Sequence, residues 1–136
     1  MQPNIQLSSI FNLRNGNTTE IKNYSLDSLK SERYTDKPVF VLTGKITFSA
    51  GESFCYDLQA LKRVTIVGVN TMGGANPGRE FSIGESYVAF IPTGRSYNYI
   101  TKSNWEGIGV TPDVLTPESE ALSKAISLIN REKNNP

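Results

Sequence analysis

The sequence has no histidine among its 136 residues and a single cysteine, Cys55. Without histidine, the chain lacks the side chain that most often acts as a general base near neutral pH. One cysteine cannot form a disulfide within the chain, and the absence of a Cys/His set excludes the usual zinc sites. No metal or other cofactor is therefore expected, and a nucleophile in this chain would need a base from elsewhere.

The chain also lacks an excess of charge of either sign, with 14 basic and 13 acidic residues and a net charge of +1. This balance gives no electrostatic basis for binding nucleic acid or an anionic membrane. No apolar run reaches the length of a membrane span, and the N-terminal residues lack the basic and apolar regions of a signal peptide. The composition, 38% hydrophobic and 20% charged, is that of a globular chain. The length fits one small domain or part of a larger one.

Two extended segments, residues 5–13 and 18–26, lie on either side of the pair Asn15-Gly16. Asn-Gly between two such segments is the strongest short signal for a β-hairpin. Residues 1–30 are therefore expected to form an N-terminal hairpin segment.

The middle of the chain has the pattern of a strand, a helix and a second strand. Residues 38–44 and 64–69 are continuous apolar runs, typical of strands buried on both faces. Between them, residues 49–62 have helical spacing, which predicts a βαβ unit with parallel strands. The apolar face of this helix is expected to comprise Phe54, Leu58 and Leu61, with Asp57 and Gln59 off that face.

The last part of the chain begins with the glycine-rich loop at residues 70–80, followed by shorter strands and a second loop. The glycine-rich loop lacks the phosphate-binding patterns and does not open a helix, so close approach to a ligand or another chain is the better interpretation. Thr116 and Pro117 predict the start of a helix, with the threonine hydroxyl as its cap. Its buried face is expected to comprise Leu122, Ala125, Ile126 and Ile129, and residues 131–136 form a polar tail.

Ser49 lies where the first apolar run meets the helix, and this position supports two interpretations. As a helix cap, Ser49 pairs with Glu52 three residues later in a capping box, which is by far the commoner role. As a nucleophile, it would attack a carbonyl whose oxyanion the free Ala50 N–H at the helix start could hold. The small residues Ala50 and Gly51 would let a substrate backbone approach closely.

Two further side chains carry possible chemistry. Glu106 follows the large apolar ring of Trp105, so it is either a partly desolvated acid that orients a base or a solvated loop carboxylate. Cys55 falls inside the helix rather than at its start, which indicates packing rather than a reactive thiolate.

The stretch VFVLTGKITFSAGESFCYDLQALKRVTIVGVNTMGGANPG, together with NWEGIGVTPDV and the helix after it, resembles the C-terminal processing (tail-specific) serine peptidases. The likeness covers about residues 38–130 and rests on the combination of motifs. It implies an α/β fold of the Clp protease/crotonase type, a ββα spiral that is incomplete on its N-terminal side here. It also implies a single partial peptidase core over residues 1–136, corresponding to the C-terminal part of the catalytic domain.

The resemblance assigns roles to particular residues. Ser49 matches the nucleophile, and one branch of the family places a lysine base at the position of Gly74. This sequence has glycine there, so it is similar to the other branch, which includes the tricorn core protease and the repeats of interphotoreceptor retinoid-binding protein. That branch takes a histidine and a second serine from upstream and a glutamate that matches Glu106. Ala50 would supply the oxyanion donor, and Gly73 and Gly74 would line the groove for a peptide or protein substrate.

Three functional hypotheses follow, since the histidine and the upstream glycine-rich turn are missing here. In the first, the chain carries the nucleophile and orienting acid of a serine peptidase and is inactive alone, because a serine without a base is weakly nucleophilic. In the second, the chain is a non-catalytic module that binds a ligand or protein. In the third, exposed sheet edges drive self-association into a homo-oligomer. Bacterial relatives imply a periplasmic or cell-envelope location.

Overall fold

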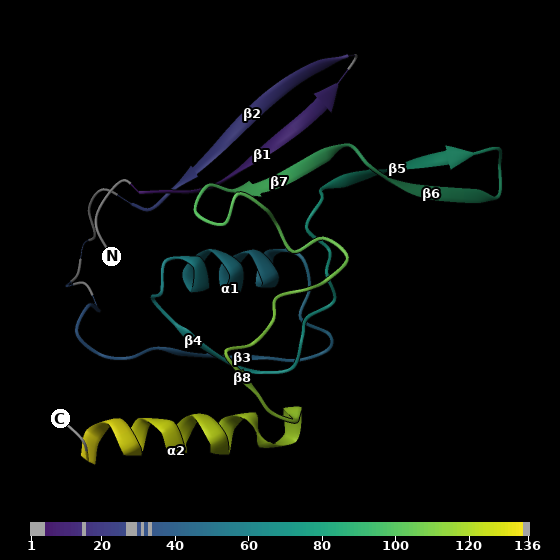
Figure 1. The fold of residues 1–136 in the computed structure, drawn as a ribbon. Coiled ribbons are helices and arrows are strands. Elements are labelled where there is room, and N and C mark those ends of the chain that lie inside the picture. Colours follow the sequence, from purple (N-terminus) through teal and green to yellow (C-terminus); the bar gives the residue numbers. More distant parts are fainter. Residues whose placement is uncertain (1–4, 15, 27–29, 31, 33, 135–136) are drawn as a thin grey trace. The chain divides into compact units, whose positions relative to one another are not determined.

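The computed structural model describes residues 5–14, 16–26, 30, 32 and 34–134. The chain divides into two compact units, one formed by residues 29–74 with 105–136 and the other by residues 2–28 with 75–104 (Figure 1). Each unit has its own sheet, and all the candidate site residues belong to the first unit.

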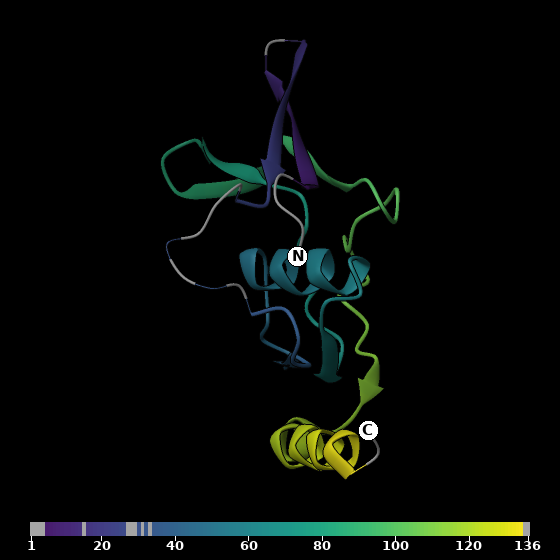
Figure 2. The same cartoon turned by 90° about the vertical axis from the view of Figure 1, so that its left-hand side faces the viewer.

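The first unit contains a three-stranded parallel sheet between two helices. Its strands are β3 (Phe40–Thr43), β4 (Thr65–Gly68) and β8 (Val114–Leu115), in the order β3-β4-β8. Helix α1 (Ala50–Ala60) connects β3 to its parallel neighbour β4, which confirms the predicted βαβ unit. Figures 1 and 2 show α1 and α2 (Ala121–Asn134) on opposite faces of this sheet.

The core of this unit lies around the central strand β4. Ile66 and Val67 are fully buried, and Val67 packs with Ala121 and Ala125 of α2. The predicted burial on both faces therefore holds for β4 but is wrong for β3, where Leu42 is exposed. The physical reason is that β3 is an edge strand, with β4 as its only neighbour in the sheet described.

Helix α1 forms where the sequence predicts it, but it buries a different face. Phe54 is exposed, whereas Glu52, Cys55 and Asp57 are buried, so the predicted buried face, with Phe54 on it and Asp57 off it, is wrong. A carboxylate is buried at acceptable cost only when hydrogen bonds replace its water. Glu52 has such partners in the neighbouring loop, and apolar periodicity does not reveal them.

Helix α2 also departs from its predicted start and face. A short 3₁₀ turn, η1 (Glu118–Glu120), precedes it, and the Thr116 hydroxyl donates to the Val114 carbonyl at 3.4 Å instead of capping a helix. Ala125 is buried as predicted, but Leu122 and Ile126 are exposed. The small side chains of Ala121 and Ala125 make the contact instead, which allows close approach to the sheet. The helix continues through residues 131–134 of the polar tail, and residues 135–136 lie outside the described part.

The second unit is made of antiparallel strands. Its sheet has the order β2-β1-β7, with β1 (Gln6–Arg14), β2 (Asn17–Tyr24) and β7 (Gly94–Asn98). A separate hairpin joins β5 (Gly78–Ile83) to β6 (Tyr87–Pro92). The pairing of Arg14 with Asn17 confirms the predicted N-terminal hairpin, and Gly16 has the positive φ of 77° that its turn requires. Asn15 lies outside the described residues.

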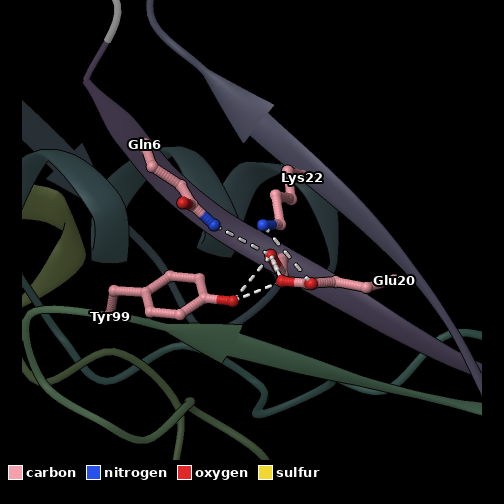
Figure 3. A network of polar contacts seen from close by, with 5 residues as sticks. Gln6, Glu20, Lys22 and Tyr99 are labelled. Atoms are coloured by element: carbon pink, nitrogen blue, oxygen red, sulfur yellow. Dashed lines mark hydrogen bonds and ion pairs between the residues drawn. The ribbon is translucent and has the colours of Figure 1, made fainter.

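A polar network joins strands β1 and β2 to Tyr99, in the turn that directly follows β7 (Figure 3). The buried hydroxyl of Ser9 donates to Glu20 Oε1 at 2.7 Å and lies 3.2 Å from the Tyr99 hydroxyl, and Tyr99 also donates to Glu20. Gln6 donates to Ser9 at 3.2 Å, and Lys22 forms an ion pair with Glu20 at 3.7 Å. The bonds from Tyr99 and Ser9 hold the pKa of Glu20 below its ordinary value. Because Ser9 is 0% exposed, this serine–carboxylate pair is structural rather than accessible to a substrate.

Candidate functional site

Ser49 is exposed at the first turn of α1 and has an unusual backbone conformation, with φ of 51° and ψ of −113°. An ordinary N-cap residue has an extended backbone with negative φ. A residue other than glycine at such φ and ψ is strained by about 1–3 kcal/mol, and strain of this kind clusters at functional sites. A strained strand-to-helix turn that exposes a serine hydroxyl is also how nucleophile elbows are built.

The backbone N–H groups at the start of α1 are not equally available. The Gly51 N–H donates to the Phe48 carbonyl at 3.1 Å, and the Ser53 N–H donates to the Ser49 carbonyl at 2.9 Å. Among the residues that the structure describes, no acceptor is found for the Ala50 N–H. An exposed donor directly after the serine is therefore open to an incoming oxyanion.

Glu52 is the best-connected side chain of the site. It is 0% exposed, and its Oε2 accepts from the Ser49 N–H at 2.8 Å, which belongs to the predicted capping box. The same carboxylate accepts from the Gly73 N–H at 2.6 Å, from the Gly74 N–H at 2.9 Å and from the Thr71 hydroxyl. One buried carboxylate thus ties the serine turn to the glycine-rich loop.

The charge of Glu52 is stabilised despite its burial. Burial alone raises the pKa of this carboxyl, but the bonds from Thr71, Gly73, Gly74 and Ser49 together outweigh it and lower the pKa below its ordinary value of 4.5. Hydrogen bonds to the charged form have this effect because protonation weakens every one of them. Glu52 is therefore ionised at neutral pH and acts as a fixed anionic acceptor.

This lowered pKa makes the stability of the chain depend on pH. A carboxyl whose pKa is lower in the folded state stabilises the fold above its unfolded pKa of 4.5, and this contribution disappears as pH falls through the folded value. We expect the free energy of unfolding, measured in urea from pH 7 to pH 3, to fall below pH 4.5. Glu52→Gln should flatten that fall, and an equally steep fall in this variant would assign it to other groups.

The glycine-rich loop is shaped by close contacts that leave no room for side chains. Gly73 has φ of +91°, and a Cβ there would lie 2.9 Å from the Gly109 nitrogen. A Cβ on Gly74 would lie 2.0 Å from Cε2 of the Phe48 ring. Both N–H groups are bonded to Glu52, and the Gly73 carbonyl accepts from the Gly107 N–H at 2.8 Å. These groups are already used within the chain, so substrate binding by the two glycines stays a prediction.

The loop that carries Glu106 is fastened to the glycine-rich loop. The Thr71 N–H donates to the Val110 carbonyl at 3.4 Å, and the Val110 N–H donates to the Thr71 hydroxyl at 2.7 Å. Trp105 is buried but Glu106 is exposed, so the desolvation suggested by its position beside the ring is not found. The hydrogen bonds nevertheless bring Ser49, Gly73, Gly74 and the Glu106 loop into one connected network.

Sequence reasoning missed the full roles of Glu52, Thr71 and Asp113. The sequence pattern places Glu52 in a capping box only and Thr71 only within a motif. Asp113 accepts from the Ile66 N–H at 2.7 Å and from the Gln59 amide at 2.9 Å, and so connects its loop to both β4 and α1. The available signal is that each residue stands within one of the quoted motifs: Glu52 in SAGE, Thr71 in TMGG and Asp113 in GVTPDV.

Cys55 and possible metal ligands can be assessed from the same geometry. Cys55 is buried. Burial is the main cause that raises the pKa of its thiol, and the negative charge of Glu52 raises it further. This environment disfavours a thiolate and agrees with the predicted packing role. Among the described residues, no three side chains of the His/Cys/Asp/Glu type gather as metal ligands would.

Peptidase family S41 matches residues 5–116 of this chain, and the chain therefore belongs to that family. The match covers the serine turn, the glycine-rich loop and the Glu106 loop. It confirms the predicted family resemblance.

Solved structures with the same fold are distant in sequence. A protein from Parabacteroides merdae described as a "putative peptidase" shares 19% identity over 95% of this chain, with a TM-score of 0.74. A lipoprotein from Streptococcus agalactiae shares 23% identity over 96% of the chain, with a TM-score of 0.64. The photosystem II D1 C-terminal processing protease shares 21% identity over 87%, with a TM-score of 0.57.

The predicted α/β peptidase fold is confirmed by these structures. The chain spans 44%, 46% and 29% of the three proteins, respectively, which is less than half of each. Within the described residues, no helix has the length and apolar character needed to cross a membrane.

The strain at Ser49 leads to a stability test. Glycine adopts positive φ without penalty, so Ser49→Gly should keep or raise the free energy of unfolding, by up to about 1 kcal/mol. Ser49→Ala keeps the strained backbone and loses the cap hydroxyl, so it should be less stable than the wild type. Urea unfolding of the wild type and the two variants measures their free energies of unfolding and tests this order of stability. Loss of stability in both variants would mean that Ser49 is an ordinary cap.

Proposed function

We propose that this chain is the C-terminal part of the catalytic domain of a serine peptidase, in which Ser49 attacks the carbonyl carbon of a peptide bond. The Ser49 hydroxyl loses its proton to a histidine supplied by a part of the protein outside this chain. The Ala50 N–H stabilises the oxyanion, and Glu106 orients the histidine or its serine partner, as in the tricorn-like branch. The substrate is a peptide or protein that lies along Gly73 and Gly74.

The observation that carries this proposal is the conformation of Ser49. Its φ of 51° is a cost that the capping box with Glu52 does not require, and the residue is exposed beside an unbonded N–H. Membership of peptidase family S41 supports the same reaction. The absence of histidine from the sequence implies that the chain alone is inactive or nearly so.

The missing base provides a direct experiment on the chain as it is. Imidazole added to the solution can take the place of the histidine, because the serine turn is exposed. We expect a fluorophosphonate to modify Ser49 slowly without imidazole and at least about tenfold faster with it, in line with the contribution of a positioned base. Intact-mass measurements over time give the rate.

Two variants separate the roles in this reaction. Ser49→Ala should remove the adduct completely, and Glu106→Gln should reduce the imidazole-dependent rate. An adduct that persists in Ser49→Ala would place the reactive hydroxyl elsewhere. No acceleration by imidazole would favour a non-catalytic binding module with the same fold.

A further inference from the structure

The β5–β6 hairpin has large apolar side chains exposed on one side. Its two strands form a sheet of their own, and no third strand pairs with them in the described part of the chain (Figure 1). Residues opposite each other in an antiparallel ladder point to the same side of the sheet. One side therefore comprises three such pairs: Arg79 with Ile91, Phe81 with Ala89 and Ile83 with Tyr87. We call the four large apolar residues of this side the apolar hairpin face, and their exposed fractions are 43% for Phe81, 56% for Ile83, 74% for Tyr87 and 47% for Ile91.

The opposite side of the hairpin is less apolar and is partly used within the chain. Glu80 lies there between Gly78 and Ser82 of β5. The Phe90 ring lies over Gly78, since a Cβ on that glycine would be 2.5 Å from the ring. An isolated two-stranded hairpin is only marginally stable in water, and a contiguous exposed apolar surface marks an interaction site. The apolar hairpin face is therefore the side on which a partner would stabilise the hairpin.

Two exposed charges lie at opposite ends of this hairpin. Arg79 is near the open end, on the same side as the apolar hairpin face, and Glu85 lies in the turn. Neither residue forms an ion pair with another described residue. Ser82 is midway between them in the sequence, so a two-fold axis at its level would bring Arg79 of each copy to Glu85 of the other. The hairpin is thus complementary in charge to a second copy of itself.

We propose that the apolar hairpin face binds the same face of a second copy of this chain, with the two hairpins antiparallel. The two hairpins pack as stacked sheets with their apolar side chains between them. The exposed parts of the four residues amount to roughly 500 Å² per copy, so the pair buries about 1,000 Å², which is the lower limit for a specific interface. This contact goes beyond the reaction proposed at Ser49, which belongs to the other unit.

Sedimentation velocity at increasing concentrations of the whole chain tests the contact. We expect a monomer–dimer equilibrium in the range of about 10–100 µM, as an interface of this size gives a weak complex. Tyr87→Ser should weaken dimerisation at least about tenfold, because it removes a large apolar side chain from both copies. Val88→Ser changes a neighbour that is 65% exposed on the opposite side of the hairpin, so it should dimerise like the wild type.

Charge reversal tests the two-fold arrangement. Arg79→Glu and Glu85→Arg should each weaken dimerisation at least about tenfold, because each change brings like charges together at both ends of the interface. An equimolar mixture of these two variants should dimerise like the wild type, since opposite charges then meet again at both ends. The double variant should do the same. Lys124→Glu, a reversal at an exposed position of α2, should leave dimerisation unchanged.

Several results would overturn the proposed contact. A chain that stays monomeric up to about 1 mM has no such interface, given that specific contacts of this size bind more tightly. Dimers that Tyr87→Ser does not weaken, or that Val88→Ser weakens equally, would belong to another surface, such as a sheet edge. Single charge variants that mixing does not restore would contradict the pairing of Arg79 with Glu85.

Discussion

Glu52→Gln is expected to lower the free energy of unfolding by about 2–4 kcal/mol, the scale for disrupting a buried, fully bonded charge. Both carboxylate oxygens accept from donors: Oε1 from Thr71 and Gly73, and Oε2 from Gly74 and Ser49. Glutamine must therefore turn its NH₂ group toward one of these pairs of donors. Such a loss is a large share of a total stability of roughly 5–15 kcal/mol.

Urea unfolding at pH 7 measures the effect of Glu52→Gln, with Glu106→Gln as the matched control. Glu106 is exposed, so its replacement should change stability by less than about 0.5 kcal/mol. The same loss in both variants, or no loss in Glu52→Gln, would contradict the assignment of Glu52 as the residue that holds the serine turn to the glycine-rich loop.

Gly73→Ala is expected to destabilise the chain by about 3 kcal/mol or more, because it combines a disfavoured φ with a backbone collision. The new Cβ would meet the Gly109 nitrogen at 2.9 Å and the Ile108 nitrogen at 3.0 Å. Backbone atoms cannot rotate away as a side chain can, so the loop carrying Glu106 must move. That movement should also break the bond from the Gly107 N–H to the Gly73 carbonyl.

Gly107→Ala provides the matched comparison for Gly73→Ala. Gly107 has a similar φ of +73°, but nothing lies within 4 Å of the position of its Cβ. Its replacement should therefore cost only the conformational strain, about 1 kcal/mol. Equal losses in urea unfolding of the two variants would mean that the close packing of the two loops contributes nothing.

The sequence predicts where the helices and strands lie along the chain better than it predicts which of their faces are buried. Asn-Gly between extended segments predicts the β1–β2 hairpin, and two apolar runs around a helical pattern predict the βαβ unit, because these signals are local. The buried faces of α1 and α2 depend on what each helix meets in space. Glu52 is buried because loop residues some twenty positions later donate to it, and no periodicity within the helix encodes that.

The features of the candidate site also divide into those that the sequence predicts and those that depend on contacts between distant segments. The position of Ser49 at a strand-to-helix junction and the free donor at Ala50 follow from the start of a helix alone. The positive φ of Ser49 is a property of the folded turn that the sequence pattern does not reveal, so the pattern leaves cap and nucleophile as alternatives. The attachment of the Glu106 loop through Thr71 and Gly73 likewise joins segments more than thirty residues apart.

A crystal structure of the chain after reaction with a fluorophosphonate in imidazole would test the nucleophile and the oxyanion donor together. We expect the phosphonyl group on the Ser49 Oγ, with its oxygen about 2.7–3.1 Å from the Ala50 nitrogen and the φ of Ser49 still positive. A phosphonyl oxygen directed away from Ala50, or a Ser49 that stays unmodified, would identify this serine as a helix cap.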